Sequence, residues 1–251
     1  MPPLFRGLID DAAVFPPGNA LLPEAIEAHQ RYRGAWYASL IGPLLLPVNR
    51  IPEARILVAD TPMPQEGSSV NLGFPFGAIG GYVPGAVQVE LPWTPHLLTE
   101  PWLGLVKVYA EVSQAGNWRA ALDSMIDTPV LPKFRTGGLS AELFPSITEL
   151  AAILAACRER GLMVKLTAGL HHAVRYTDPK TGFTHHGFLN ILAACLSPDT
   201  ESDALAVTDA VALAEVIRPH LAKVRPLWVG FGTCSVTEPL ADLIDLEIVK
   251  E

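Results

Sequence analysis

Charged residues are scarce in this chain, at 18% of its 251 residues, and the formal net charge is -8. No run of Lys and Arg interrupts this acidic balance, so the basic patch typical of a nucleic-acid-binding protein is absent. Apolar residues are abundant instead, at 49%. This composition is the opposite of that of disordered chains, so the sequence predicts a folded protein with a large core and no nucleic-acid partner.

Cysteines and long apolar runs are also lacking. The three cysteines, Cys157, Cys195 and Cys234, form neither a C-x-x-C pair nor a zinc-binding pattern. The first residues do not show the charged-then-apolar layout of a secretion signal. Pro or charged residues interrupt every apolar run within about a dozen residues, short of the roughly 20 that cross a bilayer. We therefore expect a cytoplasmic protein without a membrane partner.

Short apolar runs between turn residues predict eight β-strands. They are AWYASLIG (35–42), RILVA (55–59), SVNLGF (69–74), AVQVEL (86–91), GLVKVYAEV (104–112), PVLPKF (129–134), LMVKLTA (162–168) and LWVGFG (227–232). Helical periodicity is clearest over residues 22–33, 116–127, 146–161, 187–197 and 203–224. Ser146 and Glu149 predict a capping box at the start of the third helix, and Gly161 predicts its end.

The order of these elements predicts an α/β fold. Strands and helices alternate in the second half, as they do around a parallel sheet. The segment between residues 74 and 86 is too short and too rich in Gly and Pro for a crossover helix. The sequence therefore predicts one TIM-type (β/α)8 barrel domain over residues 1–251, irregular, with a missing or shortened helix in its first half. The alternative is an open doubly wound parallel sheet.

Two lysines each end an apolar run and precede a threonine and a glycine, in KFRTGG (133–138) and VKLTAGLHH (164–172). Active residues of parallel α/β folds gather at the carboxyl ends of strands, where Lys133 and Lys165 fall. A neighbouring cation or burial lowers the pKa of a lysine, and the free amine can then form a Schiff base with a carbonyl. In the plainer interpretation, each ammonium group simply reaches solvent.

Acidic residues occur near other predicted strands. Asp10 and Asp11 follow an apolar start, and they either enter the barrel or serve as cap or loop charges. Lys107 and Glu111 are four residues apart and share one face of a strand. If that face lines the barrel, this pair lies near the two lysines; a plain salt bridge fits equally well.

The two segments that contain Lys133 and Lys165 resemble motifs of deoxyribose-phosphate aldolase, a class I aldolase barrel. That family carries its Schiff-base lysine in K-x-x-T-G and a second lysine in K-x-x-G-G. Lys133-Phe-Arg-Thr-Gly and Lys165-Leu-Thr-Ala-Gly match these motifs in the same order. Further fragments also resemble the family in order, namely LIDDAAVFPPGNALLPEAIEAHQRYRGAWYASLIGP, VNLGFPFGA, VQVEL, VKVYAEV and GFGTCS. These fragments are spread along the chain from residue 8 to residue 235.

The resemblance implies that Lys133 forms the Schiff base, that Lys165 lowers the pKa of Lys133, and that Glu90 stands for the catalytic aspartate. No cofactor is implied. The glycine turns suit close approach of a ligand, and their N–H groups suit a phosphate. We expect substrate or phosphate binding by Arg135, Thr136, Gly137, Gly138, Gly169, Arg175, Gly232 and Ser235.

This chain also departs from the family motifs. Ala168 stands in place of the first glycine after the second lysine, His171 in place of an arginine, and Cys234 in place of a serine. Arg135 occupies a position that is small in the family. These departures leave the barrel expected, but they put the substrate and the reaction in question.

The segment GLHHAVRYTDPKTGFTHHGFLN (169–190) has no counterpart in the family and holds four of the seven histidines. One hypothesis is a loop over the site in which His171 and His172 are catalytic and transfer protons. Another is a divalent metal such as zinc, held by His171, His185 and His186. In a third interpretation these are surface histidines of a hydrogen-bonded turn.

Three functions stay open from the sequence. The first is a class I aldolase-like lyase that acts on a small carbonyl compound or sugar phosphate through a lysine Schiff base. The second is a metal-dependent hydrolase or isomerase that uses the histidine segment. The third is a non-enzymatic barrel that binds a small molecule. The oligomeric state is also open, and a homo-oligomer is compatible with the sequence.

Overall fold

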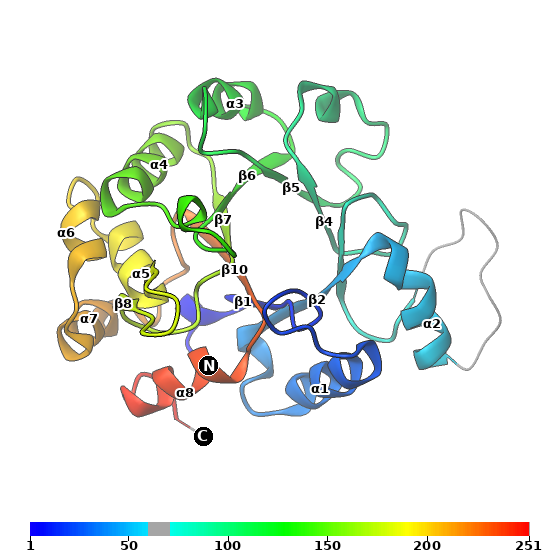
Figure 1. Ribbon diagram of the computed structural model, residues 1–251, viewed down its shortest axis with the longest axis horizontal. Coiled ribbons are helices and arrows are strands. Elements are labelled where there is room, and N and C mark those ends of the chain that lie inside the picture. The colour runs from blue at the N-terminus through cyan, green and yellow to red at the C-terminus, as the bar shows by residue number, and fades with distance from the viewer. Residues whose placement is uncertain (60–70, 251) are drawn as a thin grey trace.

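A computed structural model describes residues 1–59 and 71–250, and its centre is a closed barrel of eight parallel strands (Figure 1). The barrel strands are β1 (Ile9–Asp11), β2 (Ile41–Pro47), β3 (Phe76–Ile79), β4 (Gln88–Pro92), β5 (Lys107–Glu111), β6 (Val130–Arg135), β7 (Val164–Thr167) and β10 (Trp228–Thr233). They pair in the order β1-β10-β7-β6-β5-β4-β3-β2. Because β1 pairs with both β10 and β2, the sheet has no edge. The predicted TIM-type barrel is confirmed, and the open doubly wound sheet is wrong.

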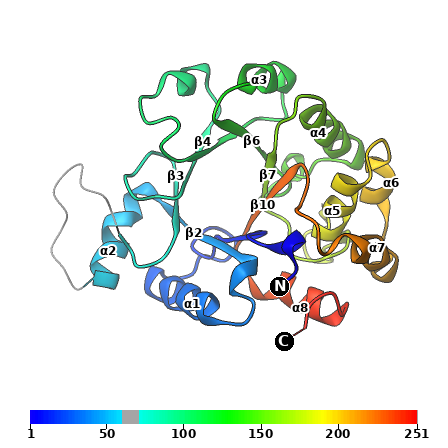
Figure 2. The same ribbon diagram turned by 180° about the vertical axis from the view of Figure 1, so that it is seen from behind.

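Helices form a ring outside these strands (Figure 1, Figure 2). They are α1 (Leu22–Gly34), α2 (Ile51–Ala59), α3 (Trp118–Met125), α4 (Ile147–Glu159), α5 (Phe188–Leu196), α6 (Glu201–Ala206), α7 (Ala210–Ile217) and α8 (Thr237–Asp245). Residues 80–87, between β3 and β4, contain no helix, and β4 connects to β5 through the 3-10 helix η4 (Pro95–Thr99). The missing helix in the first half is thus confirmed. Within residues 1–59 and 71–250, no helix combines the length and apolar character that spanning a bilayer requires.

The predicted ends of a helix were correct where the sequence carries a clear capping residue or a terminating glycine. Ser146 and Glu149 form the predicted capping box, and α4 ends just before Gly161. The helix predicted over 203–224 is instead divided, because the Asp209 side chain accepts hydrogen bonds from two N–H groups and starts α7 as a separate helix.

Three of the eight predicted strands were misplaced. RILVA is the end of α2, since a short apolar run fits a buried helix as well as a strand. Residues 38–40 of the first predicted strand form the 3-10 helix η2, and β2 begins after them. The SVNLGF prediction falls partly on residues 69 and 70, outside the described residues, and β3 begins at Phe76. In its place, the Asn71 side chain accepts from the Gly73 N–H in a turn. Only three residues long, β1 gave no periodic signal.

Alternation along β6 and β7 separates an apolar layer from a polar one. Phe134 is fully buried and meets Trp118 of α3 edge to face, so it points out of the barrel. Leu166 is also buried in the apolar layer beneath the helices. Since successive side chains of a strand point to opposite faces, Lys133 and Lys165 point into the barrel. The two lysines are also direct partners in the pairing of β6 with β7.

The two turns that follow these lysines pack against each other. The Thr136 hydroxyl donates to the Ala168 carbonyl at 2.6 Å, and the Thr136 N–H donates to Thr167. A Cβ on Gly137 would lie 2.7 Å from the Gly169 Cα. Gly169 has φ +76°, a conformation that glycine adopts without steric cost. The repeated glycines therefore let neighbouring strand ends approach closely.

We expect Gly137→Ala to lower the free energy of unfolding by about 1–3 kcal/mol, because its methyl group would overlap backbone that cannot move away independently. Urea titration followed by circular dichroism would measure the change. Gly34→Ala is the matched control, since a Cβ there meets nothing within 4 Å. Equal stability of the two variants would contradict the close packing of the turns.

Candidate functional site

A cavity of about 540 Å³ opens at the carboxyl ends of the barrel strands. The last residues of five strands line it: Ile79, Glu111, Arg135, Thr167 and Thr233. Glu90 and Lys133 also line it from two residues deeper in β4 and β6. Much of the remaining wall is apolar, from Phe15, Pro16, Pro17, Leu45, Leu139, Phe144 and Phe183. The cavity is thus an apolar chamber with a charged end inside the barrel.

The charged end is built around Lys133. Its Nζ lies 2.7 Å from Oε2 of Glu90 and 2.8 Å from Oε2 of Glu111. The Lys133 side chain is 7% exposed, whereas that of Glu111 is 29% exposed. Glu111 is therefore the carboxylate of this pair that is open to a ligand.

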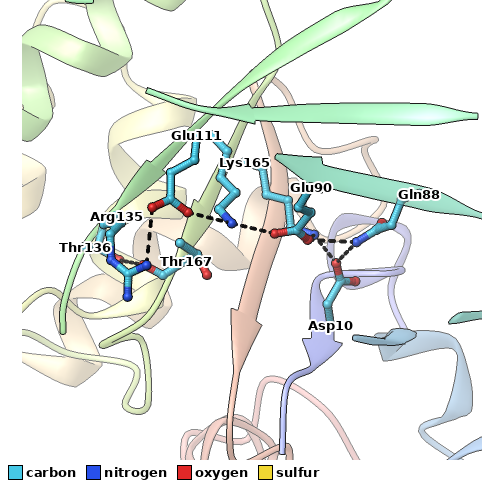
Figure 3. A network of polar contacts seen from close by, with 9 residues as sticks. Asp10, Gln88, Glu90, Glu111, Arg135, Thr136, Lys165 and Thr167 are labelled. Atoms are coloured by element: carbon cyan, nitrogen blue, oxygen red, sulfur yellow. Dashed lines mark hydrogen bonds and ion pairs between the residues drawn. The ribbon is translucent and has the colours of Figure 1, made fainter. Parts of the chain in front are cut away.

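Lys165 lies on the other side of the same carboxylate. Its Nζ donates to Oε1 of Glu90 at 2.5 Å and to Asp10 (Figure 3). The Gln88 amide completes the group by donating to Asp10 at 2.8 Å and to Glu90 at 3.1 Å. Lys165 also lies 4.6 Å from the centre of the Tyr109 ring. It is 1% exposed and does not line the cavity.

Burial and pairing shift the pKa values of this network in different directions. Burial alone would raise the pKa of Glu90, but the ammonium groups of Lys165 and Lys133 outweigh it and lower the pKa to about 2. The pKa of Lys165 is raised, because Asp10 and Glu90 together outweigh its burial. The pKa of Asp10 is raised, because its burial outweighs the attraction of Lys165. Glu90 is consequently held as a carboxylate.

Arg135 extends the network to the rim of the cavity. Its guanidinium donates to Glu111 at 3.3 Å, and its carbonyl accepts from the Gln114 amide at 2.6 Å. Its Nε is buried and finds no hydrogen-bond partner among the described residues. Arg135 therefore lines the cavity with its guanidinium paired to Glu111.

Several residues predicted from the sequence meet in this cavity. Those that line it are Glu90, Lys133, Arg135, Gly138, Gly169, His171, His185 and Gly232. Lys165 is buried beneath them. Its charge is divided between Asp10 and Glu90, so it is not the bare neighbouring cation that the resemblance implied.

Other predicted residues lie outside the cavity lining. Thr136 has its hydroxyl and its N–H engaged with the next turn, and Gly137 packs on Gly169. The Ser235 hydroxyl accepts from the Glu238 N–H at 3.4 Å at the start of α8. The Arg175 guanidinium lies 3.3 Å from a ring nitrogen of His186. The phosphate-binding role expected of these groups stays a prediction.

The four histidines of the 169–190 segment take separate partners. His171 pairs with Glu238 at 2.8 Å and His172 with Asp242 at 3.3 Å. His185 donates to the Gly169 carbonyl at 3.0 Å, and His186 lies 2.7 Å from the Pro145 carbonyl. Burial lowers the pKa of His186 to about 4. In the described part of the chain, no three side chains of His, Cys, Asp or Glu are placed to hold a metal ion.

The same segment supplies one wall of the cavity. The short strands β8 (Tyr176–Thr177) and β9 (Thr184–His185) form an antiparallel hairpin. Its His185 ring stacks on Tyr176, with 4.8 Å between ring centres, and meets Phe144 edge to face, also at 4.8 Å. His185, Phe183 and Asp178 line the cavity. The hairpin therefore covers the chamber with aromatic surface.

Sequence reasoning missed part of the network. Gln88 could have been found, because it stands two residues before Glu90 and shares its face of β4. The place of Asp10 depends on a strand of only three residues. It also depends on Gly42, where a Cβ would lie 1.9 Å from an Asp10 oxygen. That contact joins residues far apart in the sequence and leaves no local signal.

No protein-family model and no curated protein matches this chain. Two solved structures are similar to it. A Yersinia pestis DHPS with a pterine-sulfa conjugate has 11% sequence identity and a TM-score of 0.44, over 97% of this chain and 93% of that chain. A Xanthomonas albilineans dihydropteroate synthase has 16% identity and a TM-score of 0.40, over the same shares. The resemblance to deoxyribose-phosphate aldolase is not shown by these comparisons and stays a prediction.

We expect Lys165→Met to lower the free energy of unfolding by about 3–5 kcal/mol, because two buried carboxylates would lose their shared cation. Lys107→Met is the matched control, since Lys107 is exposed at the start of β5, at the other end of that strand from Glu111. Its replacement is expected to change the free energy of unfolding by less than about 0.5 kcal/mol. Chemical denaturation of both variants would measure the difference. A small effect at Lys165 would contradict its role in the network.

The lowered pKa of Glu90 predicts acid sensitivity. The pKa falls from 4.5 to about 2 on folding, so its stabilising effect is complete above pH 4.5 and is lost as the pH falls towards 2. This corresponds to roughly 3 kcal/mol. The raised pKa of Asp10 makes stability change with pH in the opposite direction. The effect of Glu90 is therefore isolated by comparing the native protein with Glu90→Gln. The unfolding free energy of the native protein should fall more steeply between pH 4.5 and pH 2.5 than that of Glu90→Gln; parallel curves would contradict the assignment.

Proposed function

We propose that the cavity is the active site of a class I aldolase-like lyase in which Lys133 forms a Schiff base with a small carbonyl substrate. The observation that carries this proposal is the place of Lys133, the lysine that lines the cavity, between two carboxylates at 2.7 and 2.8 Å. Of the two, Glu111 can accept the proton that the ammonium must lose before its nitrogen attacks, because Glu90 is held as a carboxylate.

Glu111 fits the role of proton carrier. It is open to the cavity and contacts Lys133 directly. In the first step Lys133 gives a proton to Glu111, and its nitrogen bonds to the carbonyl carbon. Glu111 returns the proton to the departing hydroxyl, and loss of water leaves an iminium ion. In the second step Glu111, again a carboxylate, takes the proton of the substrate hydroxyl. The carbon–carbon bond then breaks, and its electron pair moves towards the iminium nitrogen.

Lys165 supports this chemistry without attacking the substrate. It is buried beneath the cavity, and its charge holds Glu90 ionised and in place. The lowered pKa of Glu90 keeps a negative charge beside the iminium nitrogen, which is where positive charge develops. Lys165 is thus a positioning residue.

The cavity favours a neutral carbonyl compound with an apolar part over a sugar phosphate. Its two cationic side chains, Lys133 and Arg135, already face carboxylates, and Asp178 adds a further acid to the wall. A phosphate dianion would need to displace these pairs. A neutral carbonyl compound makes no such demand on these pairs.

Borohydride trapping tests the Schiff base. After incubation with small aldehydes and ketones and reduction, peptide mass spectrometry should find a selective adduct on Lys133 and none on Lys165. Lys133→Arg is the matched control, because arginine keeps the cation between the carboxylates but remains protonated and forms no imine. The exposed Lys180 and Lys250 report non-specific labelling.

Two outcomes would overturn the proposal. If labelling of Lys133 does not exceed that of Lys180, the cavity is not a Schiff-base site, and a ligand-binding barrel becomes the better interpretation. An adduct on Lys165 would assign the nucleophile to the other lysine. A parallel panel of sugar phosphates decides the substrate class, since we expect them to give less Lys133 adduct than neutral aldehydes.

A further inference from the structure

A cysteine and a histidine in the wall of the cavity are in line with a glutamate behind them. The Cys234 Sγ lies 3.9 Å from Nε2 of His171, and Nδ1 of His171 lies 2.8 Å from a carboxylate oxygen of Glu238. Cys234 and His171 both line the cavity. Neither belongs to the charged network around Lys133.

The barrel brings these three residues together from two neighbouring strands. Cys234 directly follows β10, and His171 follows β7, which pairs with β10. Glu238 lies in the first turn of α8, four residues after Cys234. The carboxyl ends of adjacent parallel strands therefore place the thiol beside the imidazole, and the next helix supplies the carboxylate.

The contact with Glu238 determines how the imidazole can act. A carboxylate only accepts hydrogen bonds, so the Nδ1 of His171 carries the proton that faces Glu238. In the neutral ring, Nε2 then presents its lone pair to the Cys234 thiol. A nucleophile, an adjacent base and an acid that orients the base are the parts of an activated nucleophile site.

The other two cysteines provide a contrast within the same chain. Cys157 and Cys195 are buried in α4 and α5, and burial raises the pKa of each to about 12. Cys234 is partly exposed, although burial also raises its pKa. Its resting form is therefore the thiol, and removal of the proton needs a base at contact distance.

We propose that Cys234 is a second nucleophile of this cavity, with His171 as its base and Glu238 as a positioning residue, and that it adds reversibly to small aldehydes. His171 takes the thiol proton, the sulfur bonds to the carbonyl carbon, and the carbonyl oxygen receives the electron pair and then a proton from His171. The product is a thiohemiacetal, and no other reactant is consumed. This site does not require Lys133 to react.

Alkylation with iodoacetamide measures the nucleophile. The sulfur displaces iodide, and the proton leaves through His171. We expect the Cys234 rate at pH 7 to exceed that of glutathione and to fall about tenfold or more in His171→Ala, since an aligned base contributes at least that much. His172→Ala is the matched control, because His172 pairs with Asp242 and does not line the cavity.

The role of Glu238 has its own readout. Glu238→Gln should slow the alkylation of Cys234 at pH 7, because a glutamine amide can also donate to His171 and no longer fixes the proton on Nδ1. Glu238→Asp, which restores a carboxylate, should recover part of the rate. Circular dichroism would confirm that each variant is folded, and Cys157 and Cys195 should stay unlabelled. If the Cys234 rate equals that of glutathione and does not change in His171→Ala, the proposed activation is wrong.

The aldehyde step is tested by protection. In Lys133→Arg, which forms no imine, propanal should still slow the alkylation of Cys234, and dilution should reverse the effect. Protection in the native protein but not in Lys133→Arg would mean that the aldehyde reacts only at Lys133, and the thiohemiacetal would be excluded. Protection in both, without a borohydride adduct on Lys133, would support Cys234 while refuting the Schiff base.

Discussion

The site depends on one carboxylate shared between two lysines. Glu90 accepts from Lys165 through one oxygen and from Lys133 through the other, at 2.5 and 2.7 Å. Inside a barrel, neither ammonium could remain charged without such a partner, because burial of an unpaired ion costs several kcal/mol. Glu90 in turn remains ionised because both lysines face it. Each lysine also has a carboxylate of its own, Glu111 for Lys133 and Asp10 for Lys165, and Glu90 joins the two pairs into one network.

This shared carboxylate separates the functions of the two lysines. From the sequence they look equivalent, since each closes a strand and each precedes Thr and Gly. The structure distinguishes them by depth: Lys165 is enclosed with Asp10 and Tyr109, whereas Lys133 reaches the cavity and the more exposed Glu111. The depth of each lysine depends on which side chains from other strands surround it. A local sequence motif does not encode those neighbours.

The sequence predicted the barrel, its irregular first half and the lysines that face inward, because these follow from strand periodicity and strand ends. It left open whether Asp10 enters the barrel and whether Glu111 lies beside the lysines. Those facts depend on which strands become neighbours and on a space left by Gly42. From the sequence, the glycines after the lysines were expected to bind a ligand. In the structure, Gly137 and Gly169 also allow two neighbouring strand ends to touch.

The cavity combines two chemical environments that a single ligand would meet together. At one end lie paired charges, with Glu90, Lys133 and Glu111 in contact. Elsewhere in its wall stand the aromatic hairpin and the aligned Cys234 and His171. An apolar lining lowers the local dielectric and strengthens each polar contact inside it. A neutral carbonyl compound could occupy such a chamber without disturbing any ion pair, whereas a phosphate would compete with Glu111 for both nearby cations. The pairing of charges, more than the shape of the cavity, thus limits what this site can accept.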